Sequence, residues 1–423
     1  MTMRKNLAFV AFACLAVPAA EATDGYFQPG YSVKSSGMGG VGIALPQDAL
    51  AAATNPAGMA LIGNRVDGGL SLFKPDRSVS TTGRLGTAMG PAAGTPITGD
   101  YPGNDKSLFL IPEAGLNWML NPRMAVGVSL YGNGGMNSGY ANIFPPLQSG
   151  TGVDLQQMFI SPSFAMKLDD NNAVGIALNL VQQTFRANGL SNFKPYSVAP
   201  DKLTDNGHDT STGVGVRLGW TGAVTPGLTL GATWQPETRM SSFNKYAGLF
   251  AGGAHFDIPE TYGVGFAWTP APQWTLAGDV VRINYAKVKA IGNTADCFYQ
   301  QQCMLGQDNG PAFGWKNITV VKLGAAYQVS PELTLRAGWN HSDNPVQSSQ
   351  VFLNTIAPAV TQDHLTLGAT YAVRKDMEIS VDYVHALQNS VTGPLPPGFA
   401  AAGSTETVRM NQNTLGVSVG WMF

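Results

Sequence analysis

The chain of 423 residues has few charged side chains, with 25 lysines and arginines and 27 aspartates and glutamates, together 12% of the sequence. That share is about half of what soluble globular domains usually carry. The two signs nearly cancel, to a formal net charge of −2, so no basic patch for nucleic acid is indicated. The composition therefore argues against an ordinary soluble domain and against a nucleic-acid partner.

Long apolar runs are also missing. After the N-terminal region, no stretch approaches the roughly 20 apolar residues that a membrane helix requires. At the N-terminus itself, Arg4 and Lys5 precede an apolar segment, residues 7–17, and a small-residue cleavage motif, residues 20–22. We predict that residues 1–22 are a signal peptide, which exports the mature chain.

Cysteine and histidine are scarce, with three and five copies. Without the signal peptide only Cys297 and Cys303 remain, and two cysteines this close in an exported chain predict one disulfide. Two thiolates without a nearby histidine make an incomplete set of zinc ligands, so we predict no metal.

No serine or zinc-hydrolase motif includes the histidines, so we predict no enzyme activity and no cofactor, although a triad assembled only in space stays open.

Glycine is plentiful, with 51 copies, and apolar residues alternate with small or polar ones along many short segments. At the C-terminus every odd position from Leu415 to Phe423 is apolar. The same alternation recurs in six other segments: 124–130, 173–180, 214–220, 262–268, 333–339 and 377–383. A period of two fits a soluble sandwich or a membrane barrel, but so many one-sided strands favour the barrel, because closure leaves no unpaired edge in lipid.

Tight turns divide the chain at six places: 121–123, 169–172, 225–227, 270–272, 330–332 and 374–376. Each interval has room for two strands and a long loop. Short turns of bacterial barrels face the periplasm, and six of them join seven hairpins. We therefore predict an all-β fold, a 14-stranded antiparallel transmembrane β-barrel formed by residues 65–423, with both of its ends on the periplasmic side.

Residues 23–64 precede the barrel and are too few for a domain core of their own. A barrel of this size encloses more space than its side chains fill, so we predict that this segment is a hatch that plugs the lumen. Asn55, Pro56 and Ala57, with the alanine-rich stretch before them, resemble the hatch of the FadL family of outer-membrane transporters for long-chain fatty acids, some of which import aromatic hydrocarbons. The resemblance covers the mature chain and includes the terminal Phe423.

The resemblance implies passive uptake: outer loops capture a hydrophobic compound, a lumen pocket accepts it, and a kink in the third strand releases it sideways into the membrane. Gly132, Gly134 and Gly135 end the predicted third strand and would interrupt its ladder, unless they simply begin a loop. The apolar residues of the third and fourth long loops are candidates for capture or for loop-to-loop packing: Leu190, Phe193, Tyr196, Phe243, Tyr246, Leu249 and Phe250. Arg217 and Lys322 should face the lumen, where they could bind a fatty-acid carboxylate, pair with Asp67, Glu378 or Asp382, or hold the hatch.

Long-chain fatty acids are the expected substrates, with aromatic or alkane hydrocarbons as the alternative. A lipase-like enzyme or a structural barrel also stays open, whereas a general porin would have 16–18 strands and an open channel. The expected partners are hydrophobic small molecules and the lipid and lipopolysaccharide of the bacterial outer membrane. We expect a monomer.

Overall fold

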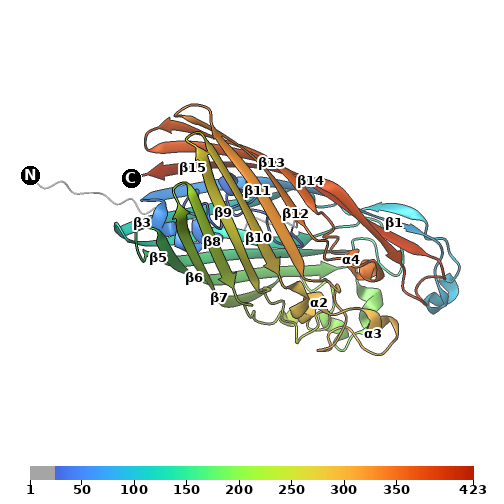
Figure 1. The fold of residues 1–423 in the computed structure, drawn as a ribbon. Helices are drawn as coiled ribbons and strands as arrows, with labels where there is room; N and C mark the ends of the chain where they lie inside the picture. The colour runs from blue at the N-terminus through green and yellow to red at the C-terminus, as the bar shows by residue number, and fades with distance from the viewer. Residues whose placement is uncertain (1–23) are drawn as a thin grey trace, which may run out of the picture.

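The computed structural model describes residues 24–423, and their sheet closes on itself as an antiparallel barrel (Figure 1). The strands of the ring pair in chain order, with β3 following β1, and β15 pairs with β1 to complete the ring. Among the strands of residues 24–423, only the short β2 lies outside the ring, paired with β1. The predicted 14-stranded barrel is therefore confirmed, whereas the predicted signal peptide lies outside the described residues.

The strands are β1 (Arg65–Thr82), β2 (Gly99–Pro102), β3 (Phe109–Asn121), β4 (Met124–Asn137), β5 (Gly152–Lys167), β6 (Asn172–Asn188), β7 (Asp209–Thr225), β8 (Leu228–Gln235), β9 (Thr261–Ala271), β10 (Trp274–Ile283), β11 (Ile318–Gln328), β12 (Leu333–Ser342), β13 (Asp363–Arg374), β14 (Met377–Pro394) and β15 (Thr405–Met422). The α-helices are α1 (Val33–Ser36), α2 (Lys289–Gly292), α3 (Asp296–Tyr299) and α4 (Val351–Asn354). The 3₁₀ helices are η1 (Ala51–Ala53), η2 (Pro56–Leu61), η3 (Thr87–Ala92), η4 (Ser191–Tyr196), η5 (Pro200–Lys202), η6 (Asn244–Tyr246), η7 (Tyr285–Lys287) and η8 (Ser348–Gln350). Within residues 24–423, no helix has the length and apolar character needed to cross a membrane.

The alternating pattern places apolar side chains on the outside of the barrel. On β15, Val417 and Trp421 are 47% and 50% exposed, whereas Gly416, Ser418 and Gly420 between and beside them are buried. All six predicted tight turns join consecutive strands. A protein exterior lined by apolar side chains suits lipid rather than water, so the odd-numbered residues of β15 from Leu415 to Trp421 face hydrocarbon.

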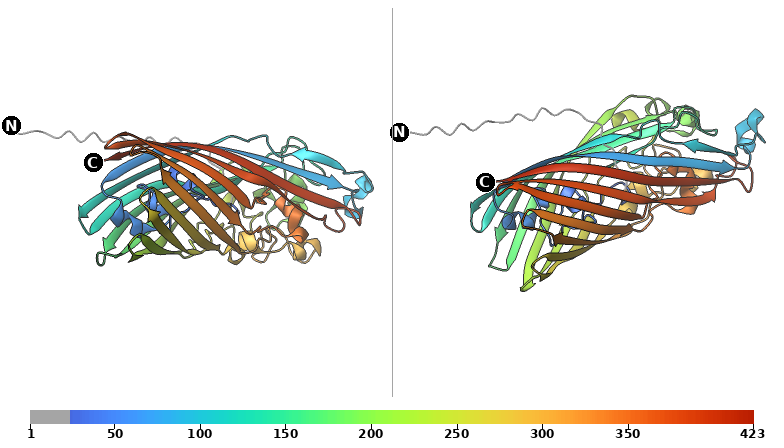
Figure 2. Two further views of the ribbon diagram at one scale, coloured as in Figure 1. Left: turned by 45° about the horizontal axis from the view of Figure 1, so that its top comes forward. Right: turned by 90° about the horizontal axis from the view of Figure 1, so that it is seen from above.

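The barrel is much taller on one side. Strands β8 to β12 contain 8 to 11 residues, close to what spans hydrocarbon, whereas β1, β14 and β15 contain 18. The long strands continue beyond the membrane as a sheet (Figure 2). There β2, which the sequence did not predict, pairs with residues 78–81 of β1. Residues 391–407 were expected to be a long loop, but Thr392 of β14 bonds Thr407 of β15 within this range. The actual loop is residues 395–404.

The N-terminal segment, residues 24–64, packs against the inner face of the barrel wall, where glycines make room for its backbone. A Cβ atom added at each of seven inward glycines would come within 3.0 Å of an atom of this segment: Gly115, Gly175, Gly219, Gly231, Gly324, Gly338 and Gly368. These glycines come from seven different strands. These seven glycines therefore allow close contact between the wall and the N-terminal segment.

Candidate functional site

The ladder between β3 and β4 stops partway along the two strands. Their pairing runs from Asn121 and Met124 to Glu113 and Tyr131, and beyond that point β4 pairs only with β5. Residues 109–111 of β3 pair only with β1. We call the gap between residues 109–112 and 132–137 the β3–β4 opening.

The predicted kink residues lie along this opening. The register of β4 against β5 shifts between Gly132 and Gly134, so that Asn133 is an extra residue, as in a β-bulge. Residues 131–137 are all buried, although alternation in a barrel wall should expose every second one. This end of β4 therefore turns inward from the wall.

The first residues of the N-terminal segment fill the opening. Phe27 forms an isolated antiparallel bridge with Gly134, flanked by bonds from the Gln28 N–H to the Asn133 carbonyl (3.2 Å) and from the Gly135 N–H to the Tyr26 carbonyl (3.0 Å). Gly134 is required here, since a Cβ at that position would collide with the Tyr26 carbonyl oxygen. Residues 24–31, which we call the N-terminal tip, thus take the place of β3 at the edge of β4.

Tyr285 anchors the N-terminal tip from the opposite wall. Its hydroxyl donates to the Asp24 carbonyl (2.6 Å) and accepts from the Tyr26 N–H (3.2 Å). The Tyr26 ring is fully buried and contacts Phe27, Tyr285 and two further aromatic rings. Tyr285 therefore adds two hydrogen bonds and aromatic packing to the backbone bonds that join the N-terminal tip to β4.

Replacing Tyr285 with phenylalanine should loosen the N-terminal tip and expose Tyr26 and Phe27 to chymotrypsin. The change leaves the buried Tyr26 N–H without its partner, at a cost of about 1–3 kcal/mol. It also removes the shorter of two hydrogen bonds to the Asp24 carbonyl, which still accepts the Phe27 N–H (3.4 Å). Cleavage of the folded protein within the N-terminal tip should become several-fold faster. Tyr140→Phe is the matched control, because the Tyr140 hydroxyl bonds the Thr355 carbonyl in the outer loops. Equal cleavage of both variants would contradict the anchoring role.

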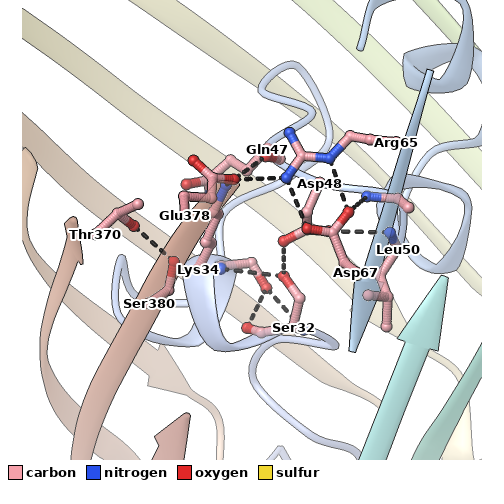
Figure 3. Close-up of polar contacts among 12 residues, drawn as sticks. Ser32, Lys34, Gln47, Asp48, Leu50, Arg65, Asp67, Thr370, Glu378 and Ser380 are labelled. Carbon is pink, nitrogen blue, oxygen red and sulfur yellow. Dashed lines mark hydrogen bonds and ion pairs between the residues drawn. The ribbon is translucent and has the colours of Figure 1, made fainter. Parts of the chain in front are cut away.

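The rest of the N-terminal segment is fixed to β1 and β14 by buried charges (Figure 3). Glu378 on β14 pairs with Lys34 of α1 and with Arg65 of β1, the latter at 2.6 Å. Arg65 also holds Asp67 at 2.6 Å, and Asp67 accepts the Ala49 N–H at 2.8 Å. Burial lowers the pKa of the Lys34 amine, so that its charge depends on these carboxylates.

The hatch motif fixes a turn and a contact with the wall. The Asn55 side chain accepts the Ala57 N–H (3.1 Å), which caps η2, and its amide donates to the Ile43 carbonyl (2.6 Å) and the Trp220 carbonyl (2.9 Å). Pro56 occupies the start of η2, where no N–H is needed. The three residues have a structural role between the N-terminal segment and β7.

The two predicted lumen cations lie around one cavity of about 40 Å³, and both already bind the N-terminal segment. Arg217 donates to the Thr54 carbonyl (3.2 Å) and to Gln235 (2.8 Å). Lys322 donates to the Pro29 carbonyl and lies 4.0 Å from the Asp24 carboxylate. Of the three roles left open by the sequence, these contacts match holding the N-terminal segment.

The loop residues named as candidates for capture or for loop-to-loop packing are packed against each other. Leu190, Phe193, Phe243, Tyr246 and Phe250 are buried, and Tyr196 and Leu249 are half-buried. These contacts match loop-to-loop packing, because the side chains come from neighbouring loops that bury one another. Two groups result: one surrounds Phe185, and the other lines a cavity of about 40 Å³.

The second group defines the loop cavity, which is lined by apolar side chains alone: Leu147, Leu190, Phe193, Leu203, Leu249, Phe298, Leu305, Phe352, Leu353 and Ile356. Sequence reasoning missed Phe298 and Phe352, because it considered only the third and fourth loops. Phe298 directly follows Cys297, which is disulfide-bonded to Cys303 with Cα atoms 5.4 Å apart. In the sequence, the cysteine pair was the one feature that could have pointed to this part of the site. In the described part of the chain, no cluster of His, Cys, Asp or Glu could hold a metal ion.

Comparison with known proteins identifies relatives of the same architecture. The crystal structure of the Pseudomonas putida toluene transporter TodX aligns with a TM-score of 0.67 and 18% identity over 93% of this chain and 99% of that chain. A Pseudomonas aeruginosa FadL homologue gives 0.69 and 16% over 94% and 100%. The Ralstonia pickettii toluene transporter TbuX gives 0.63 and 18% over 93% and 99%. Among curated proteins, no relative matches.

A family profile settles the relationship at the level of sequence. The profile described as outer membrane protein transport protein (OMPP1/FadL/TodX) matches residues 15–394, which is most of the chain. The members of this family are outer-membrane β-barrels that transport hydrophobic compounds. The chain belongs to the OMPP1/FadL/TodX family of outer-membrane transport proteins.

Proposed function

We propose that this protein takes up hydrophobic compounds passively and releases them sideways into the membrane through the β3–β4 opening. The observation that carries the proposal is the unpaired edge of β4, which the N-terminal tip covers with a few backbone bonds. A wall closed by a complete strand ladder would have to break many bonds to let a solute through. Here, displacing the N-terminal tip is sufficient.

The entry step uses the loop cavity. Its volume of about 40 Å³ is far below the 300–1,000 Å³ of an open ligand pocket. A solute must therefore separate loop side chains as it enters, and apolar solutes are favoured because they replace apolar contacts. Leu190, Phe193 and Leu249 line this cavity, whereas Phe243, Tyr246 and Phe250 pack beside it and Tyr196 contacts Phe298. We propose the first three as direct contacts of the solute.

The exit step needs no energy source. Leu110, beside the opening on β3, is 37% exposed on the lipid side of the wall. Each CH₂ group that moves from water to hydrocarbon gains about 0.8 kcal/mol. The overall transfer of an apolar solute from water to the bilayer therefore lowers its free energy. We further propose that the protein works as a monomer surrounded by outer-membrane lipid and lipopolysaccharide.

Two substrate classes follow from different observations. The resemblance to the FadL family favours long-chain fatty acids. The geometry favours neutral hydrocarbons, the class to which the substrates of the toluene transporters TodX and TbuX belong. The loop cavity is lined only by apolar side chains, and both Arg217 and Lys322 already bind the N-terminal segment, so neither is available to a carboxylate without moving that segment. We therefore propose neutral hydrocarbons as the substrate class.

Replacing Lys322 with glutamine should separate the two classes. A neutral substrate never touches the amine, so toluene uptake by cells lacking other such channels should stay the same or rise, because the N-terminal tip loses a contact. Palmitate uptake should not fall selectively. Selective loss of palmitate uptake would show instead that Lys322 binds a carboxylate and that fatty acids are the substrates. Arg336→Gln is the control, since Arg336 bonds Gln47 and Thr370 away from the tip.

A further inference from the structure

The cystine of the fifth long loop joins two walls of the loop cavity. Cys297 lies in α3, and the next residue, Phe298, is buried and lines the cavity. Cys303 is followed closely by Leu305, which lines the same cavity. Leu305 is itself tied to the third loop, since its N–H donates to the Tyr196 carbonyl (2.9 Å) and its carbonyl accepts the Val198 N–H (3.0 Å).

Phe298 connects loops that are distant in sequence. Its ring stacks on Phe399 of the last loop, with centroids 6.4 Å apart and an interplanar angle of 18°. It also meets the Tyr196 ring edge-on at 6.0 Å. An aromatic side chain in such a position buries a large area and excludes water from the cavity beside it.

Besides the cystine, one turn of backbone hydrogen bonds holds the segment that carries Phe298, among them Tyr299 N–H to the Ala295 carbonyl (3.0 Å) and Gln302 N–H to the Cys297 carbonyl (2.7 Å). Helix α3 has four residues and no side-chain cap, and helices this short are not stable by themselves. Gln350 contributes one bond to the Ala295 N–H (2.7 Å) and one to Asp296 (2.9 Å). The covalent closure from Cys297 to Cys303 limits the conformations of the residues between them far more strongly.

We propose that the Cys297–Cys303 disulfide is a positioning element for solute capture: it holds Phe298 as a wall of the loop cavity and so sets the affinity of the outer loops for apolar solutes. The inference rests on the proposed function, because it assumes that the loop cavity is the capture site. It assigns to the cystine an effect on solute affinity, separate from the stability of the barrel. Phe298 would be a direct contact of the solute, and the two cysteines would act through it.

A double-mutant cycle tests this assignment. The variants are Cys297→Ser with Cys303→Ser, Phe298→Ala, and all three changes together, each measured by the concentration dependence of toluene uptake. The serine pair and Phe298→Ala should each raise the half-saturating concentration about tenfold with the maximal rate unchanged, as expected for lost binding. In the Phe298→Ala background, removal of the cystine should have no further effect, because the two act as one unit.

Each other outcome of the cycle overturns the proposal. An unchanged half-saturating concentration in the serine pair would show that the cystine does not position the cavity wall. The triple variant could also have a higher half-saturating concentration than Phe298→Ala, by the same factor that separates the serine pair from wild type. That result would show that the cystine supports the loops in general. If the serine pair does not fold, the comparison is made on folded wild-type protein before and after treatment with dithiothreitol, which reaches the half-buried Cys297 from solvent.

A Leu190→Asn variant distinguishes failure of the proposed capture site from failure of the proposed role of the cystine. This change places an amide in the wall of the loop cavity without touching the cystine. If it leaves the half-saturating concentration unchanged, the loop cavity is not the capture site and the proposed entry step fails. If it weakens uptake while the serine pair behaves as wild type, only the role of the cystine fails.

Discussion

Replacing Glu378 with alanine should make the protein leak small polar solutes while the barrel remains folded. Glu378 is the acidic partner that Lys34 and Arg65 share, and the side chains of Lys34 and Arg65 are only 6% and 8% exposed. Removing one member of a buried ion pair costs about 3–5 kcal/mol when the remaining charge has no partner. Arg65 still has Asp67, whereas Lys34 keeps a neutral acceptor, the Gln47 carbonyl (3.2 Å), so the Lys34 charge is left without a counter-charge. Lys34 belongs to the N-terminal segment, so this cost falls on its docking rather than on the strand ladder.

The leak can be measured as ionic conductance across planar bilayers, with heat-modifiable migration on gels as the test of barrel folding. Glu378→Gln should leak less, because it keeps an acceptor for both donors. Glu332→Ala, in the exposed turn between β11 and β12, is the control and should stay closed. Deletion of residues 24–64 sets the upper limit of conductance. A deletion variant that does not conduct would show that the predicted hatch does not plug the lumen.

The architecture was predictable because a barrel in lipid imposes one simple pattern on every strand. Val417 and Trp421 must face hydrocarbon and Gly416 must face inward, and this alternation is visible without knowledge of any partner strand. The strand count followed from the turns for the same reason. What alternation could not show was where strands continue outside the membrane, as β14 and β15 do around Thr392 and Thr407.

The site was harder to predict, because it depends on contacts between residues far apart in the chain. Arg217 and Lys322 were correctly expected to face inward, but their partners, Thr54 and Pro29, are set by the path of the N-terminal segment. Likewise, three glycines indicated that the strand ladder is interrupted in β4, but nothing in the neighbouring sequence indicated that Phe27 would pair with this part of the strand. Loop residues follow no period, so burial of the loop aromatics was beyond sequence reasoning.

Replacing Gly132 with leucine should block uptake. A Cβ at this position would lie 3.0 Å from the amide nitrogen of Gln28 and 3.3 Å from a methyl group of Ile111. These residues line a cavity of about 30 Å³ between the N-terminal tip and the wall, at the base of the β3–β4 opening. The Gln28 side chain is long enough to move aside, so a leucine can be accommodated. It would then fill the space through which the solute leaves.

The expected result is toluene uptake reduced at least tenfold at all concentrations, that is, a lower maximal rate with the loop cavity intact. Gly68→Leu is the matched control: a Cβ there meets only one atom, the Glu113 carbonyl oxygen at 4.0 Å, so the side chain has room to extend. Tyr285→Phe should act in the opposite direction and raise the maximal rate, because it frees the N-terminal tip that Gly132→Leu obstructs. If a folded Gly132→Leu variant transported toluene at the wild-type rate, the solute would have to leave by another route, and the gap between β3 and β4 would be only a structural feature of the wall.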